Sequence, residues 1–223
     1  MKMFSETKLP YVEILLDALC SWVKEHPDEY LSDNEAFDLI DDLCGKENSV
    51  NFEVRSGCSR IVFTHSSWDF VLKLTYYDYE GEDVCLREYQ YFLQAKEYDI
   101  QNILLPISDF ADCGLPNGHL YIQPKISIQH SRLEYSDAFS ALLRTNYESL
   151  DDGVVDDIND AVYCSRLPRE WLAYAIKCFS KEFMERFAQW TCKLKVNDLH
   201  GSNVGFLNER PIILDYAGFY YNS

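Results

Sequence analysis

Hydrophobic residues near the N-terminus have the spacing of an amphipathic helix. In residues 10–23 the apolar side chains recur every three or four positions, which puts them on one helical face. The positions on this face are Val12, Leu15, Leu16, Leu19 and Val23. A second helix is expected to begin at the Ser-Asp-Asn-Glu sequence starting at Ser32 and to end at Gly45. The pattern therefore predicts a helical extension over residues 1–50.

From residue 51 the spacing changes to runs of β-branched and aromatic residues separated by turn residues. Such runs predict strands. Strands are expected at 52–55, 60–65, 70–77, 103–109 and 119–125. Residues 83–98 return to helical spacing, with Leu86, Tyr89 and Leu93 facing inward. Residues 51–127 are therefore expected to form a five-stranded antiparallel lobe with one helix.

The last part of the chain, residues 128–223, is expected to be a mainly helical lobe that ends in a β-rich loop. Ser136 and Asp137 suit the cap of a helix that runs to Leu143, and Pro168 suits the first turn of a long helix. Aromatic residues follow the helical repeat of that long helix, which predicts a buried stripe and not a cofactor site. The stripe consists of Ala175, Phe179, Phe183, Phe187, Trp190 and Leu194.

Composition and charge narrow the classes of partner. The 223 residues are 47% hydrophobic, enough for one large domain or two small lobes, and the net charge is −17. That charge argues against direct nucleic-acid binding, because phosphates would be repelled. Acidic residues gather at 28–42, 76–83 and 148–160. These runs are either solvated surface, or a docking face for host protein substrates that are basic or nucleic-acid-associated, or a partial mimic of nucleic acid.

Eight cysteines without a Cys-x-x-Cys pair indicate reduced thiols. We see no secretory signal and no apolar run near the roughly 20 residues that a membrane span needs. The expectation is a soluble, cytoplasmic protein without a membrane partner.

Three polar residues near the C-terminus suggest phosphoryl transfer. Asp198 and Asn203 lie in Asn-Asp-Leu-His-Gly-Ser-Asn, and Asp215 follows Asn203 by twelve positions. Transfer from ATP needs one carboxylate to orient the attacking hydroxyl, and an amide and a second carboxylate to hold magnesium. Each residue alone is typical of an ordinary turn, but together they favour these three roles. Two short strands, at 204–206 and 211–214, are expected between them.

This arrangement resembles the protein-kinase family, whose catalytic loop reads H-R-D-L-x-x-x-N and whose metal-binding loop reads D-F-G. The chain keeps the five-residue step from Asp198 to Asn203. The resemblance implies a two-lobed fold that binds ATP and Mg²⁺ as its cofactors. It also implies that Lys73, in Phe-Val-Leu-Lys, contacts the phosphates and pairs with Glu88. Glu82 and Glu97 are the alternatives for this partner, and Glu88 is favoured because Leu86, Tyr89 and Leu93 flank it on a face that must pack. His200 is expected to orient the catalytic-loop backbone.

The same resemblance places a nucleotide-binding loop and a hinge in the first lobe. Ser56-Gly57-Cys58-Ser59, followed by Val62, stands where kinases have a glycine-rich loop, although an ordinary hairpin turn has the same pattern. The adenine hinge is expected near Gln123 and Lys125. The full set of expected nucleotide-binding residues is Ser56, Gly57, Cys58, Ser59, Val62, Lys73, Gln123 and Lys125.

The chain departs from the family pattern in three places. Val196 and Asn197 replace the His and Arg of H-R-D, the glycine of D-F-G is displaced to Gly218, and eight residues follow Asp215. No activation segment or peptide-docking platform is therefore expected. This shortened form is similar to the early host-takeover protein kinase of short-tailed bacteriophages, and to small bacterial effector kinases.

The phage resemblance implies a serine/threonine kinase that acts on host proteins in the host cytoplasm. The alternative is a kinase-like binding protein, or pseudokinase, that sequesters a host protein through its acidic surface without catalysis. A small-molecule phosphotransferase of the aminoglycoside type is a third possibility. That class, however, usually adds a large helical substrate domain for which this chain has no room.

Overall fold

The computed structural model describes residues 11–26, 29, 31–56, 60–75, 83–112, 119–126 and 152–217, except for the side chains of 109–112. The chain forms two compact units. One comprises Met1–Tyr89 with Ile107–Lys125, and the other Gln90–Pro106 with Ile126–Ser223. The N-terminal helices, expected as a separate extension over residues 1–50, belong to the same unit as the strands.

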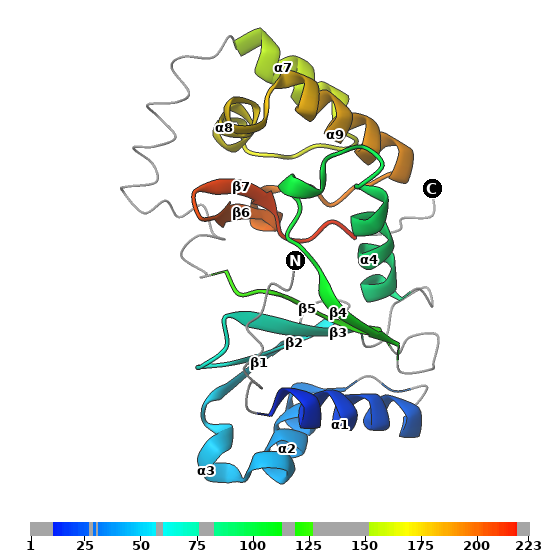
Figure 1. Ribbon diagram of the computed structural model, residues 1–223, viewed down its shortest axis with the longest axis vertical. Helices are drawn as coiled ribbons and strands as arrows, with labels where there is room; N and C mark the ends of the chain where they lie inside the picture. The colour runs from blue at the N-terminus through cyan, green and yellow to red at the C-terminus, as the bar shows by residue number, and fades with distance from the viewer. Residues whose placement is uncertain are drawn as a thin grey trace. The chain divides into compact units, whose positions relative to one another are not determined.

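The first unit contains a five-stranded antiparallel sheet in the order β1-β2-β3-β5-β4 (Figure 1). Its strands are β1 (Phe52–Ser56), β2 (Arg60–His65), β3 (Phe70–Thr75), β4 (Ser108–Asp112) and β5 (His119–Pro124). The prediction of a strand over 103–109 was wrong at its start. Ile103 instead ends a 3-10 helix, η1 (Gln101–Ile103), which belongs to the second unit, and it is buried with Leu104, which bridges to Ile213 of that same unit. A short apolar run does not itself distinguish a strand from other buried backbone.

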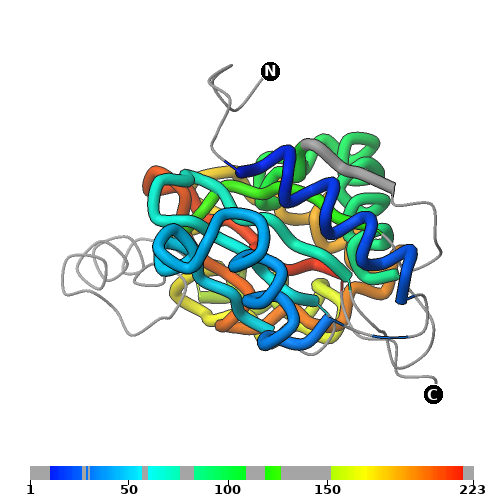
Figure 2. The backbone as a smooth tube through the Cα atoms, turned by 90° about the horizontal axis from the view of Figure 1, so that it is seen from below, coloured from blue at the N-terminus to red at the C-terminus, as the bar shows by residue number. Residues whose placement is uncertain are grey.

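One face of this sheet packs against the N-terminal helices. These are α1 (Val12–Glu25), α2 (Asp33–Cys44) and the short α3 (Lys46–Ser49). Figure 2 shows α1 and α2 crossing the same side of the strands. The shared core includes Leu15, Leu19, Ile40, Ile61, Phe63, Phe70, Leu72, Leu74, Leu120 and Ile122. Residues 11–50 are thus part of this unit's core and not an appended extension.

Both N-terminal helices were predicted from their sequence patterns. Leu15, Leu19 and Val23 are buried on α1, as the apolar spacing indicated. Ser32 begins α2 with a capping box, in which its hydroxyl accepts from the Glu35 N–H and the Glu35 carboxylate accepts from the Ser32 N–H.

The helix α4 (Val84–Gln94) begins with a cap that joins it to the sheet. Asp83 accepts hydrogen bonds from the Leu86 N–H at 2.8 Å and the Thr75 hydroxyl at 2.9 Å, and its other oxygen lies 2.6 Å from Nδ1 of His119. The helix ends earlier than the expected residue 98. Leu93 was predicted to face inward but is 49% exposed.

The second unit contains α7 (Asp152–Ala161), α8 (Arg169–Phe179), α9 (Lys181–Leu194) and the hairpin β6 (Val204–Leu207) and β7 (Arg210–Ile213). One long helix was predicted where α8 and α9 are found. Ser180 separates them with φ of 93°, and its hydroxyl accepts from the Phe183 N–H at 3.3 Å. The aromatic stripe continues across this break, because the Phe179 and Phe183 rings stack at 4.6 Å.

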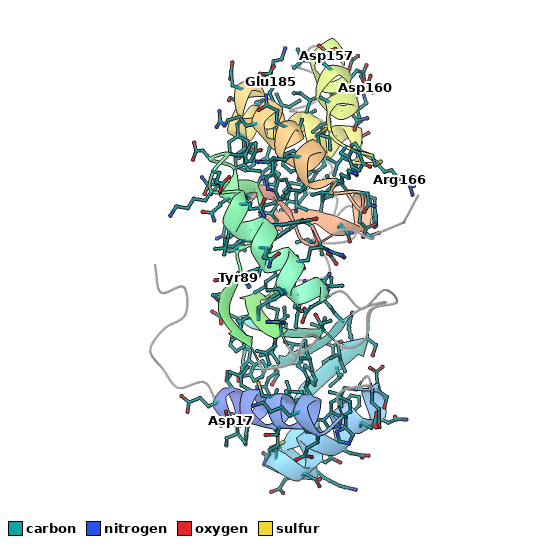
Figure 3. All side chains as sticks on the ribbon, turned by 90° about the vertical axis from the view of Figure 1, so that its right-hand side faces the viewer. Asp17, Tyr89, Asp157, Asp160, Arg166 and Glu185 are labelled. Carbon is teal, nitrogen blue, oxygen red and sulfur yellow. The ribbon has the colours of Figure 1, made fainter. Side chains whose placement is uncertain are left out.

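The acidic run near residue 150 partly forms α7, an amphipathic helix that the sequence did not reveal. Val155 and Ile158 are buried, while Asp157 and Asp160 are exposed. Figure 3 shows these two side chains on α7 and Glu185 on α9. The helix expected at 136–143 lies outside the described residues. Within the described segments, no helix is long and apolar enough to cross a membrane.

Candidate functional site

The loop that follows α9 is held by two buried apolar side chains, Val196 and Leu199. The Val196 N–H donates to the Thr191 carbonyl at 3.0 Å, and the Leu199 carbonyl accepts from the Arg166 N–H at 2.8 Å. Asp198 lies between these anchors, with its side chain 18% exposed. The loop therefore fixes a carboxylate that is mostly removed from water.

Asn203, five residues after Asp198, is hydrogen-bonded to it. Its Nδ2 donates to the Asp198 carboxylate oxygen Oδ2 at 2.9 Å and to the Asp198 backbone carbonyl at 2.8 Å. These two bonds fix the amide orientation, because only the nitrogen can donate. The oxygen Oδ1 of Asn203 is then on the opposite side of the amide from Asp198.

His200 was expected to orient the loop backbone, and it also contacts the same carboxylate. Its Nδ1 accepts from the Ser202 N–H at 3.2 Å, so a neutral ring carries its proton on Nε2. That Nε2 lies 3.1 Å from Oδ1 of Asp198. Each oxygen of Asp198 thus has one side-chain donor, His200 on Oδ1 and Asn203 on Oδ2. The sequence places His200 two residues after Asp198 but does not determine which side-chain atoms meet.

The β6-β7 hairpin brings Asp215 to the loop that contains Asn203. The hairpin turn is Asn208-Glu209, with φ of 52° and 63°, which suits a tight two-residue connection. After β7, the Leu214 N–H donates to the Asn203 carbonyl at 2.8 Å. Asp215 follows directly and is partly buried. The three predicted residues therefore come together in one unit, on two loops joined by a backbone hydrogen bond.

Buried contacts support the hairpin from both ends. The indole Nε1 of Trp171 on α8 donates to the Gly205 carbonyl at 3.2 Å. The hydroxyl of Tyr216 donates to the Leu105 carbonyl at 2.9 Å, and the Leu105 N–H donates to the Ile213 carbonyl at 2.8 Å. These bonds hold the backbone on both sides of Asp215.

The pKa of Asp198 is raised above its ordinary value of 3.8. Burial is the largest cause, because it disfavours the charged form, and the Asp215 carboxylate raises the pKa further. The positive charge of His200, when protonated, and the hydrogen bond from Asn203 oppose this shift. A carboxylate of this kind is a better proton acceptor than an ordinary aspartate.

The raised pKa makes stability depend on pH in a defined direction. The native state binds this proton more tightly than the unfolded chain, so Asp198 lowers the free energy of unfolding as pH rises through 3.8 and the raised pKa. We expect Asp198→Asn to gain stability relative to the wild type between acidic and neutral pH. Urea unfolding at several pH values measures the difference. A difference that stays constant, or that shrinks as pH rises, contradicts this assignment.

The donor set near Asp198 suits magnesium better than a transition metal. The described residues contain no group of three or more His, Cys, Asp or Glu side chains that could hold a metal ion. An amide oxygen of Asn203 and a carboxylate of Asp215 are hard oxygen ligands. Magnesium is often held by only one or two carboxylates, with waters and phosphates completing its shell. The expected metal ligands therefore fit Mg²⁺ in type and number.

The first unit has a polar sheet face opposite the N-terminal helices. Directly paired residues on antiparallel strands share a face, and the register pairs Val62 with Lys73 and Lys73 with Tyr121. Gln123 is two positions further along β5 and lies on the same face. Lys73 is partly buried, with Nζ 5.8 Å from the centroid of the Tyr121 ring. This face thus contains three of the expected nucleotide-binding residues: Val62, Lys73 and Gln123.

The other expected nucleotide-binding residues lie elsewhere or are outside the described residues. The Lys125 N–H donates to the Asp69 carbonyl at 2.7 Å, and its Nζ to the His65 carbonyl at 3.4 Å. The backbone N–H and the side chain of Lys125 are thus both hydrogen-bonded within the first unit. The backbone N–H of Lys125 therefore does not match the expected donor to adenine. The hydroxyl of Ser56 is hydrogen-bonded to Asp33 on α2. Gly57, Cys58 and Ser59 lie outside the described residues.

Glu88 is fully buried on α4 but has a different partner from the one expected. Its Oε2 is ion-paired with Nη1 of Arg60 and accepts from the Tyr121 hydroxyl at 2.6 Å. The expected pair with Lys73 is therefore replaced by a pair with Arg60. The inward face of α4 also differs from the prediction, and its buried residues are Val84, Cys85, Arg87, Glu88 and Tyr91, followed by Ala95.

Comparison of the sequence with protein-family models and with curated proteins found no match.

Proposed function

We propose that this protein is an ATP- and magnesium-dependent phosphotransferase with a two-lobed, protein-kinase-like fold. The observation that carries this proposal is the hydrogen bond from the Leu214 N–H to the Asn203 carbonyl. It brings Asp198, Asn203 and Asp215 onto adjoining loops, and these residue types match the requirements of phosphoryl transfer.

In this proposal each residue has a distinct role. Asp198 accepts a hydrogen bond from the attacking hydroxyl and orients it, while His200 and Asn203 hold the carboxylate at 3.1 and 2.9 Å. Asn203 and Asp215 hold the magnesium, which when bound neutralises charge on the phosphates. On the polar sheet face of the first unit, Lys73 provides a cation for the phosphates, and Val62 and Gln123 line the nucleotide site.

We infer that the substrates are host-cell proteins phosphorylated on serine or threonine, as the resemblance to early phage kinases implies. The acidic side chains exposed on α7 and α9, among them Asp157, Asp160 and Glu185, suit a basic protein substrate (Figure 3). The same acidic surface supports the second candidate function, sequestration of a host protein without catalysis.

Thermal unfolding with ATP and magnesium separates these two functions. A ligand at 100 times its Kd stabilises the folded state by about 2.7 kcal/mol, and each kcal/mol raises the midpoint by roughly 2–4 °C in a chain of this size. We expect a rise with ATP and Mg²⁺ that is smaller with ATP and a chelator. The variant Asp215→Asn should lose the magnesium-dependent part, whereas the matched surface variant Asp157→Asn should keep it. An unchanged midpoint for the wild type contradicts a nucleotide site and favours the binding protein.

A further inference from the structure

The strand β1 lies at one edge of the first unit's sheet and pairs with β2 on one side (Figure 1). The Ser66 N–H donates to the Asn51 carbonyl at 2.9 Å. Residue pairs in an antiparallel ladder alternate between hydrogen-bonded and non-hydrogen-bonded, so this bond sets the phase of the ladder. The backbone groups of Phe52, Val54 and Ser56 therefore point away from β2, toward the outer edge.

The outer edge of β1 has unpaired backbone groups. Within the described segments, no strand pairs with this edge, and no backbone group is hydrogen-bonded to the outward N–H and C=O of Phe52 and Val54. The side chains of these two residues are each only 8% exposed, because they face the core beneath the N-terminal helices. A row of unpaired N–H and C=O groups is a template for pairing with another strand.

The other face of β1 has one negative and one positive side chain, on either side of Val54. Glu53 is 51% exposed and Arg55 is 57% exposed, and Nε of Arg55 donates to Oε1 of Glu53 at 2.7 Å. Among the described residues, Oε2 of Glu53 and Nη1 of Arg55 have no hydrogen-bond partner. Each side chain can therefore make a second ion pair without losing the first.

This order of charges is self-complementary in an antiparallel pair. If two copies of β1 pair about a two-fold axis at Val54, Glu53 of each copy lies opposite Arg55 of the other. The two Val54 residues then form a hydrogen-bonded pair, which puts Glu53 and Arg55 at non-hydrogen-bonded positions, where cross-strand side chains are closest. Charges that protected the edge from its own copy would repel at these positions, and these attract.

The charges also select one register. The outward backbone groups lie on every second residue, so the neighbouring registers differ by two positions. One of these registers puts Glu53 opposite its own counterpart, and the other puts Arg55 opposite its own counterpart. Like charges directly opposite each other destabilise a strand pair. Only the register centred on Val54 pairs opposite charges.

We propose that β1 is a self-association surface, and that its occupant is β1 of a second copy of this chain, paired about a two-fold axis at Val54. Such a contact uses the same residues on both copies and closes at a dimer. The sheet of one copy then continues into the sheet of its partner. The inference does not depend on the proposed phosphotransferase.

This dimer is expected to be weak. A pair of five-residue strands is smaller than a standard interface, and the net charge of −17 repels two copies at long range. At about 0.15 M salt, charges farther apart than about 8 Å are largely screened, whereas the ion pairs at the strand edge are shorter than this. We expect a dissociation constant of about 10–500 μM.

Sedimentation equilibrium of the full chain, from about 5 μM to about 1 mM, tests the proposal across that range. The wild-type mass should rise from monomer toward dimer. Glu53→Arg and Arg55→Glu each put like charges at both cross-strand pairs, and each should weaken the dimer by about tenfold or more. The matched controls are Glu13→Arg and Lys24→Glu at exposed positions of α1, and both should stay within about twofold of the wild type.

An equimolar mixture of Glu53→Arg and Arg55→Glu separates strand pairing from a general effect of charge. The two variants have opposite charges at both cross-strand pairs, so the mixture should form a heterodimer at least as tight as the wild-type dimer. This result also shows that both variants are folded. A wild type that is monomeric at about 1 mM, a mixture that forms no heterodimer, or controls that weaken the dimer as much as the β1 variants overturns the proposal.

Discussion

Replacing Asp198 by asparagine is expected to lower the rate of phosphate transfer by about 10²–10⁴-fold, the usual contribution of a positioned general base. Asparagine keeps the size of the side chain but cannot accept a proton, and its amide group would face the donors on His200 and Asn203. The measurement is the initial rate of labelled phosphate incorporation from ATP into proteins of a host-cell lysate.

The loss of rate should occur without loss of the fold. Burial raises the pKa of Asp198, so removing its charge at neutral pH relieves part of the cost of burying it. The control is Asp157→Asn, which changes an exposed carboxylate on α7 (Figure 3) and should leave the rate unchanged. A folded Asp198→Asn variant with the wild-type rate contradicts the assigned role.

Replacing Trp171 by alanine is expected to have the largest effect on stability, about 3–5 kcal/mol in the free energy of unfolding. Trp171 is 0% exposed, and its indole donates to the Gly205 carbonyl in β6. Truncation leaves a large cavity and removes the donor to a buried carbonyl, and both destabilise the fold. Urea unfolding followed by circular dichroism measures the change.

Two further variants calibrate the effect of Trp171. Trp171→Phe keeps most of the apolar volume but loses the donor, so a smaller loss is expected. Glu170→Gln, at the exposed neighbour on the same helix, should stay within about 0.5 kcal/mol of the wild type. A loss below about 1 kcal/mol for Trp171→Ala, the level of a typical substitution, contradicts the packing described between α8 and β6.

Elements with a clear local pattern could be predicted from the sequence. The apolar spacing of α1, the Ser32 cap of α2 and the strand at 60–65 are all found where the pattern indicated. The break at Ser180 could not be predicted from periodicity, since the aromatic repeat continues through it. A serine inside an apparent helix can instead begin a new one, because its hydroxyl replaces a missing backbone acceptor.

The candidate site shows the same difference between local and long-range information. Asp198 and Asn203 were both identified from one short motif, and a separation of five residues keeps them on the same loop. The pair of Arg60 with Glu88 joins residues 28 positions apart, and only the sheet register and the rotation of α4 determine it. Lys73 and Arg60 are both strand cations on the same face, so the sequence alone did not decide which one Glu88 contacts.

The most direct test of the proposed phosphotransferase is incubation of the wild-type protein with γ-labelled ATP, magnesium and host-cell lysate. We expect label to appear on serine or threonine residues of lysate proteins, and to be absent when magnesium is chelated or when Asp198 is replaced by asparagine. No incorporation by the wild-type protein, or equal incorporation by the Asp198→Asn variant, would contradict the proposed function.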